Sequence, residues 1–155
     1  MIVAKNLLLF CLLFLSVIAF GFGQPLAGGR SPVTLVGLTL EDLINNFGIP
    51  RSVYAVRGLE EWQDDVVFVY DGVDFYVFED RVWQVGLRSF MGINTGDPGS
   101  VVSLILDSTQ GFSKLETRRD SVSYSINEGS LPMILTCDFD EAGRVRGIYI
   151  FRSDL

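Results

Sequence analysis

The sequence predicts an α+β fold in which helices pack on one face of an antiparallel sheet. Two helix-start signals are each followed by short segments of alternating character joined by tight turns. Residues 80–87 and 143–150 are also similar, because each segment places Arg-Val after a turn and then apolar residues at the same offsets. We therefore expect two degenerate copies of one helix-then-meander unit, over residues 36–90 and 91–155.

The first helix has the clearest local signals in the chain. Thr39 is a good N-cap, and Asp42 stands three residues later, where it completes a variant of the capping box. Gly48 is suited to the left-handed position that ends a helix, and Pro50 prevents its continuation. One face is predicted to be buried, because apolar residues recur with the helical period at Leu40, Leu43, Ile44 and Phe47.

The segments after this helix predict a meander of antiparallel strands. Asp71-Gly72 is a strong type I′ hairpin signal, and Glu79-Asp80 forms a second tight turn. The strands are expected at residues 53–56, 65–70, 73–78 and 81–88.

The second half of the chain repeats this order. Asp97 is a plausible N-cap with Pro98 at the first helical position, and Gly111 is a plausible helix stop. Three strands are expected after it, at residues 121–126, 133–139 and 144–152.

The N-terminal residues predict an exported precursor. Lys5 precedes an apolar run over residues 7–20, and small residues follow at Ala19, Gly21 and Gly23, so residues 1–23 are interpreted as a signal peptide. An uncleaved anchor is the alternative, but the run is shorter than the ~20 residues that span a bilayer. Residues 24–35 are expected to be a flexible lead-in, and no membrane span is expected after cleavage.

Composition excludes several classes of function. The chain has no histidine, which removes serine–histidine and cysteine–histidine mechanisms and the commonest metal ligand. Its net charge of −7 argues against nucleic acid as a partner. Cleavage leaves Cys137 as the single cysteine, and we interpret it as a buried structural thiol. The acids near Asp140 are interpreted as a polar hairpin turn rather than a calcium loop. No catalytic residue, metal site or cofactor is predicted.

Aromatic residues on the predicted strands are the candidates for a binding surface. Because side chains alternate along a strand, one face of the sheet can carry Tyr and Trp away from the core. These residue types are enriched at interface hot spots. The alternative, of about equal weight, is that they cover the second face of the core. The candidates are Tyr70, Tyr76, Trp83 and Tyr149.

The segment Gly37-Leu38-Thr39-Leu40-Glu41-Asp42-Leu43, followed by Phe47-Gly48-Ile49-Pro50, resembles the opening helix of the small outer-membrane assembly lipoproteins of the BamE/SmpA type. Two such units in tandem look like the architecture of the beta-lactamase inhibitor protein. Residues 78–82 and 139–145 resemble the hairpin that these units carry late in the sheet. The chain lacks the lipid-attachment cysteine of the first group and the paired disulfides of the second.

This resemblance implies an exported binding or scaffolding protein of the bacterial cell envelope rather than an enzyme. It implies a periplasmic location, with secretion as the alternative, and a partner that is another envelope or secreted protein. Two further functions remain open: a carrier of a small apolar ligand, and an inhibitor of a secreted enzyme. The oligomeric state is not predicted.

Overall fold

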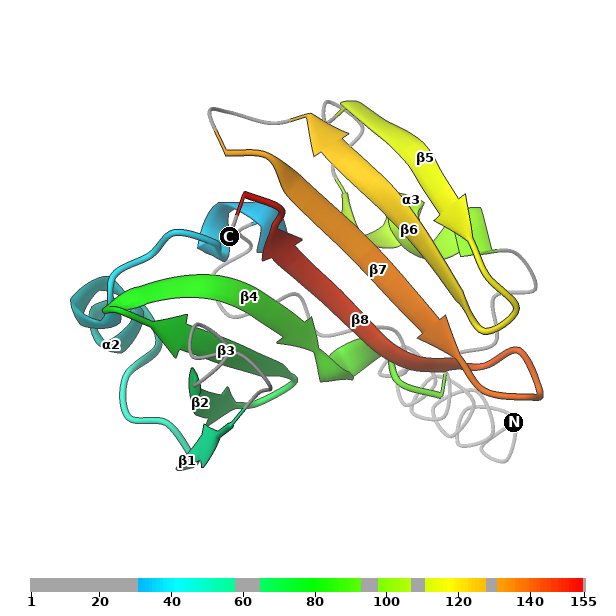
Figure 1. Ribbon diagram of the computed structural model, residues 1–155. Coiled ribbons are helices and arrows are strands. Elements are labelled where there is room, and N and C mark those ends of the chain that lie inside the picture. Colours follow the sequence, from blue (N-terminus) through cyan, green and yellow to red (C-terminus); the bar gives the residue numbers. More distant parts are fainter. Residues whose placement is uncertain (1–30, 58–64, 93–97, 107–110, 128–130, 155) are drawn as a thin grey trace, which may run out of the picture.

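Most of the protein is one antiparallel sheet. The computed structural model describes residues 31–57, 65–92, 98–106, 111–127 and 131–154. Eight strands lie in the order β1-β2-β3-β4-β8-β7-β6-β5. Figure 1 shows the two meanders side by side, with β4 and β8 meeting between them. The strands are β1 (Ser52–Val56), β2 (Asp65–Tyr70), β3 (Val73–Phe78), β4 (Arg81–Leu87), β5 (Gly111–Thr117), β6 (Ser121–Asn127), β7 (Met133–Phe139) and β8 (Val145–Arg152).

The predicted α+β fold class is wrong, because the sheet dominates the described residues and the helices are short. α2 (Leu40–Phe47) and α3 (Pro98–Ile105) have eight residues each. Besides them, the described residues form the 3-10 turns η1 (Pro32–Leu35) and η3 (Arg88–Phe90). The helix starts were recognised, but each helix ends after about two turns. The residues after α3, where no strand was expected, form the additional strand β5.

The start and the end of α2 agree with the capping signals. The hydroxyl oxygen of Thr39 accepts a hydrogen bond from the Asp42 amide at 3.0 Å. The carboxylate of Asp42 in turn accepts from the Thr39 amide and hydroxyl, at 3.4 and 2.7 Å. These bonds hold the pKa of Asp42 below its usual value. Gly48 follows with a φ of 74°, as a left-handed residue after a helix requires.

Thr39→Ala is expected to lower the free energy of unfolding by about 1 kcal/mol, because it removes the acceptor for the Asp42 amide. Thr39→Ser keeps a hydroxyl at this position and is the control. Urea denaturation measures both variants. Equal loss of stability in the two variants would show that the methyl group, not the cap, is what matters.

The tight turns were located correctly, but the type I′ turn is a different one from that predicted. Positive φ at both central residues defines this turn, and it occurs at Glu79 and Asp80, with φ of 46° and 63°. At the Asp71-Gly72 hairpin, only Gly72 has a positive φ. The two-residue loop nevertheless pairs Tyr70 directly with Val73.

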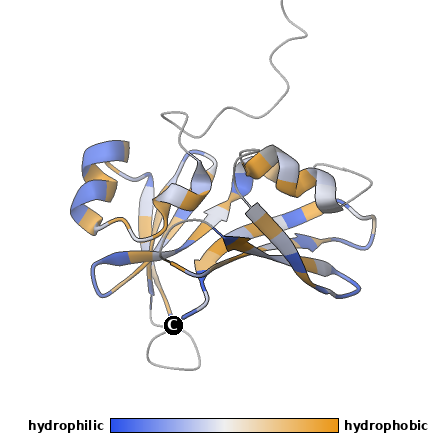
Figure 2. Ribbon diagram, turned by 90° about the horizontal axis from the view of Figure 1, so that it is seen from above, coloured by the Kyte–Doolittle hydropathy of each residue, from blue (hydrophilic) through white to orange (hydrophobic). Residues whose placement is uncertain are grey.

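The core lies between the sheet and the short helices. Figure 2 shows the helices together on one side of the sheet, while the opposite face has no helix among the described residues. We call this opposite side the open face. The lead-in was expected to extend to residue 35, but η1 buries Val33 and Leu35. The inner strands of the meanders contribute alternate apolar side chains to this core, including Phe75, Val85, Leu135 and Ile150.

The two meanders meet along a short seam. β4 and β8 pair antiparallel through Gln84↔Phe151, Val85↔Ile150 and Gly86↔Tyr149. Near the start of β4, the Gly37 amide donates to the Val82 carbonyl at 2.7 Å, and the Gly92 amide donates to the Val145 carbonyl of β8 at the same distance. The division into units 36–90 and 91–155 stays a prediction. The predicted signal peptide, the start of the lead-in and Asp97 lie outside the described residues.

Candidate functional site

Three tyrosines lie on the open face and form the candidate site. Tyr54, Val67 and Tyr76 are direct cross-strand partners on β1, β2 and β3, so their side chains share one face. Tyr149 of β8 reaches the same face beside Gly86 of β4, its cross-strand partner. We call Tyr54, Tyr76 and Tyr149 the tyrosine platform. It crosses both meanders at the seam.

Two glycines let the rings lie close to the sheet. A Cβ atom at Gly86 would lie 3.5 Å from ring atoms of both Tyr76 and Tyr149. A Cβ atom at Gly147 would lie 2.8 Å from the Tyr149 ring. The ring of Tyr149 therefore occupies the space above both glycines. Aromatic side chains that cover glycines in this way also protect the backbone of a sheet.

The tyrosine platform is an acidic and partly desolvated surface. Burial is the largest cause that raises the pKa of Tyr76 to about 12, and the nearby Tyr149, Tyr54, Asp74 and Asp65 contribute to the same shift. Tyr76 is therefore a neutral hydrogen-bond donor and a partly apolar ring at physiological pH, not a proton-transfer group.

Trp83 reaches the open face through an irregularity in the sheet. The pairing of β3 with β4 shifts register between Tyr76 and Val77, where a residue of β4 is inserted. The indole Nε1 of Trp83 donates to Oδ1 of Asp65 at 2.7 Å. Asp65 itself is buried. Trp83 is thus a half-buried, oriented side chain beside the tyrosine platform.

Tyr70 is the one predicted site residue that the structure does not bring to this face. Its ring packs in the core, 5.6 Å from the centres of both Phe47 and Phe75. Its hydroxyl donates to the carbonyl of Gly48 at 2.9 Å, which holds the end of α2. Tyr70 therefore connects α2 to the sheet and has a structural role.

A partly buried ion pair lies at the edge of the platform. Asp74 lies opposite Gly86 on the open face, and its Oδ2 is 3.1 Å from Nε of Arg88. Nη2 of Arg88 also donates to the carbonyl of Tyr70 at 2.6 Å. Oδ1 of Asp74 is buried and has no hydrogen-bond partner among the described residues. Burial raises the pKa of Asp74, and the charge of Arg88 opposes this shift.

The open face becomes polar beyond the seam. Thr136 of β7 is the cross-strand partner of Tyr149, and Ser123 of β6 is the partner of Thr136. Their hydroxyl oxygens lie 3.0 Å apart, so one donates to the other. Asp138 shares this face, and burial raises its pKa. The open face therefore joins the tyrosine platform to a half with hydroxyl and carboxyl groups.

The two remaining candidate groups, the Cys137 thiol and the Asp140 carboxylate, are held in the core and within a turn. Cys137 points into the core, as predicted, and burial raises its pKa to about 12, so the thiol stays protonated. Among the described residues, no cluster of carboxylates and thiols has the arrangement of a metal site.

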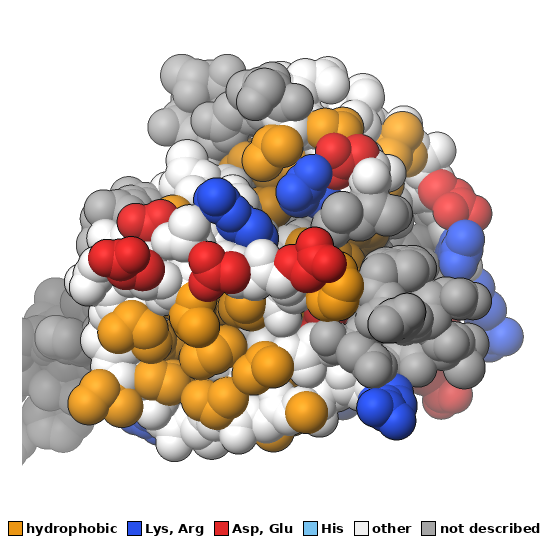
Figure 3. Space-filling model, turned by 60° about the vertical axis from the view of Figure 1, so that its left-hand side comes forward, with side chains coloured by type: hydrophobic (Ala, Val, Ile, Leu, Met, Phe, Trp, Pro, Cys, Tyr) orange, Lys and Arg blue, Asp and Glu red, His pale blue; other side chains and the backbone are white. Residues whose placement is uncertain are grey.

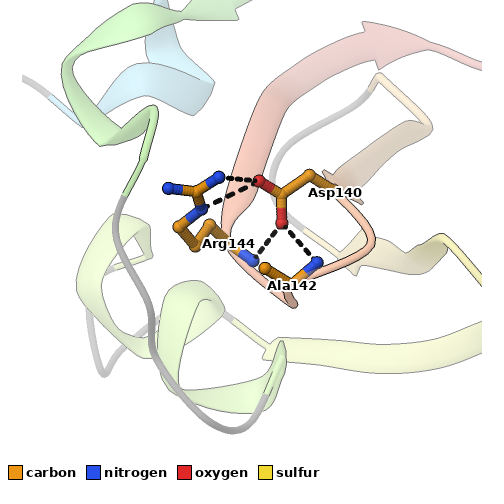
Figure 4. Close-up of polar contacts among 3 residues, drawn as sticks. All are labelled: Asp140, Ala142 and Arg144. Atoms are coloured by element: carbon orange, nitrogen blue, oxygen red, sulfur yellow. Dashed lines mark hydrogen bonds and ion pairs between the residues drawn. The ribbon is translucent and has the colours of Figure 1, made fainter.

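Asp140 confirms the hairpin interpretation (Figure 4). Its Oδ1 accepts from the amides of Ala142 and Arg144, and its Oδ2 contacts the Arg144 guanidinium. Both carboxylate oxygens are therefore used within the turn, and its geometry is that of a self-contained loop.

Three residues of the site were not predicted from the sequence. Tyr54 stands on a short edge strand, and alternation from Ser52 to Val56 would have placed it on the open face. Gly86 and Gly147 are glycines inside strands, a pattern that indicates close approach of another group to the backbone. These two glycines, read together with the neighbouring Tyr149, are the sequence signal from which the platform could have been found.

No family model and no curated protein matches the chain. Among solved structures, the chain is similar to an extracellular protein containing a SCP domain from Bacillus anthracis, at 12% identity and a TM-score of 0.47. The match covers 82% of this chain and 47% of that chain, so this chain spans about half the length of the protein it matches. At this identity and TM-score, the likeness says nothing about the activity of the chain.

The described part of the chain holds no helix with the length and apolar character needed to cross a membrane.

Proposed function

We propose that the protein is an exported, non-enzymatic binding module whose tyrosine platform contacts another protein of the cell envelope. Export is supported by the leader at residues 1–23, with its basic start and apolar run. The periplasm is the proposed location, in line with the resemblance to envelope proteins. The observation that carries the binding role is that Tyr54, Tyr76 and Tyr149 share one open sheet face.

The chemistry of the platform suits a protein partner. Tyr offers a rigid ring with a polar end, which gives contact area at a low cost in side-chain entropy. The rings of Tyr76 and Tyr149 are already held against Gly86, so binding costs little further side-chain entropy. The adjacent hydroxyl groups of Ser123 and Thr136 supply donors and acceptors for a polar rim.

Tyr76→Ala/Tyr149→Ala is expected to weaken partner binding by about thirtyfold, since a loss of about 2 kcal/mol is typical of aromatic hot spots. The chain is expressed with its own leader, recovered with its bound proteins from envelope extract, and the affinity for the recovered partner is then measured.

Phe112→Ala is the matched control, because it removes an exposed ring from edge strand β5, far from the platform. Thermal unfolding shows that each variant is folded. Equal binding by the double variant and the control, or no recovered partner, would contradict the proposed function.

A further inference from the structure

The two edges of the sheet are built differently. β5, at one edge, carries the charged residues Lys114 and Glu116, and its pairing with β6 shifts register between them. Charges and bulges are the devices by which natural proteins prevent another strand from adding to an edge. β1, at the other edge, has the sequence Ser-Val-Tyr-Ala-Val, with no charge and no proline. It pairs with β2 in regular register over all five residues.

β1 is apolar on both sides of the sheet. Val53 and its neighbour Val66 lie on the helix side, and they are 50% and 40% exposed. Tyr54 and Val56 lie on the open face, 47% and 37% exposed. A strand placed beside β1 would therefore find apolar contacts for its side chains on both faces, as alternation along a strand requires.

The apolar surface extends beyond β1 on the helix side. Ile49 is 92% exposed just before the strand, and Ile44 of α2 is also exposed. Figure 3 shows hydrophobic side chains gathered at this end of the molecule, bordered by a row of acidic side chains with basic side chains beside that row. We call the group Ile44, Ile49, Val53 and Val66, together with Val56 on the open face of the same strand, the edge patch. Grouped exposed apolar residues of this kind mark interaction sites more often than scattered ones do.

We propose that β1 accepts an extended segment of another protein as a ninth strand, and that this segment alternates apolar residues and carries Lys or Arg beside them. Main-chain hydrogen bonds to the open side of β1 supply affinity, and the edge patch supplies contacts for alternate side chains. Among the described residues, no strand occupies that side of β1.

Charge decides between a different protein and a second copy of this chain. The acidic border of the edge patch attracts basic residues, and the whole chain carries a net charge of −7. A second copy would bring the same net charge and the same acidic border to the contact, which disfavours pairing of two identical edges. The occupant that the charges fit is therefore a basic segment of another protein.

Strand addition at β1 does not require Tyr76 or Tyr149, so this proposal and the proposed function can fail independently. The probe is a short synthetic peptide of alternating valine and threonine with lysine at both ends. Two comparison peptides are used: one with glutamate in place of lysine, and one with alternate amides methylated, which cannot pair as a strand. Binding to the full chain is measured by fluorescence anisotropy, and amide hydrogen exchange is followed in β1.

Val53→Lys adds a charge to the edge and is expected to weaken peptide binding by about tenfold or more, because an edge lysine opposes strand addition. Leu115→Lys is the matched control, since it adds the same charge at an exposed position of the other edge strand, β5. Leu115→Lys is expected to bind like the unchanged protein. Bound peptide is expected to slow exchange of β1 amides.

Several results would overturn the proposal. These are no binding of the lysine peptide to the unchanged protein, equal binding of the glutamate or methylated peptide, and equal weakening by Leu115→Lys. A dimer in sedimentation that Val53→Lys dissolves would also overturn it, because the occupant would then be a second copy. Loss of binding in Tyr76→Ala/Tyr149→Ala alone would place the peptide on the tyrosine platform instead.

Discussion

Phe75→Ala is expected to lower the free energy of unfolding by about 3–5 kcal/mol, the typical cost of removing a large aromatic side chain from a core. Phe75 is 0% exposed. Its ring centre lies 4.9 Å from that of Phe47 and 5.6 Å from that of Tyr70. The substitution therefore removes one of the two rings through which Phe47 of α2 contacts the sheet, and it leaves a cavity that the short helices cannot easily fill.

Urea denaturation of Phe75→Ala beside Phe112→Ala measures this effect. Both are strand phenylalanines with a nearby tyrosine ring, but Phe112 is 42% exposed and its ring centre lies 5.8 Å from that of Tyr124. We expect Phe112→Ala to cost less than about 1 kcal/mol, as is usual for surface positions. Similar losses in the two variants would show that α2 contributes little to the stability of the sheet.

Arg88→Met is expected to lower the free energy of unfolding by about 1–3 kcal/mol, because it leaves the Asp74 carboxylate buried without a cation. Removing one partner of a fully buried pair costs about 3–5 kcal/mol. The Arg88 side chain is 43% exposed, so solvent screening reduces this figure. Arg51→Met is the control, since its partner Asp71 and Arg51 itself are 75% and 70% exposed. That exposed pair is expected to contribute less than about 1 kcal/mol.

The pH dependence of the Arg88→Met variant has a definite sign. The pKa of Asp74 is raised in the folded protein, so the folded state binds more protons than the unfolded state between the two pKa values. Stability from this group therefore increases as the pH falls through the folded pKa. Without Arg88 that pKa is higher still, and the gain on acidification is larger.

Urea titrations near neutral pH and at mildly acidic pH test this, with Arg88→Met/Asp74→Asn as a further variant. The double variant is expected to regain part of the lost stability and to lose the additional pH dependence. If the single and double variants respond to pH alike, the desolvated charge of Asp74 is not the cause of the loss.

The sequence predicted α2 and the hairpins well because the interactions that form these elements lie within a few residues of one another. The cap at Thr39, the apolar spacing and Gly48 act within a few residues of one another. The fold class depended instead on how many residues form helices and how many form the sheet. Two well-formed helix starts suggested a larger helical layer than the two eight-residue helices of the structure.

β5 was missed because it has almost none of the pattern of a half-buried strand. All seven of its residues are exposed, and Phe112 and Leu115 are three apart rather than two. The register shift near Lys114 interrupts what alternation there is. An edge strand of this kind is held by pairing with β6, which is not visible in its own sequence.

The sheet face of the candidate side chains was predicted in part, because alternation within a strand is local but the register between strands is not. Tyr76 and Tyr149 lie on the open face as the candidate surface required. Tyr70 was wrongly included, although the two-residue loop at Asp71-Gly72 pairs it with the inward-facing Val73. That pairing places both side chains on the core side. The position of Trp83 on the open face depends on the register shift near Tyr76, and no pattern in the sequence predicts that shift.

The position of β8 has a consequence for how the chain folds as it is delivered. β8 is the last strand along the chain that the structure describes, yet it lies in the middle of the sheet, between β4 and β7. A chain that emerges from a channel with its N-terminal end first can complete the β1–β4 meander early. The backbone groups of β4 that pair with β8 then remain without their strand partner until β8 has emerged. The two meanders can therefore join only after β8 has emerged, so the centre of the sheet is completed later than its β1–β4 half.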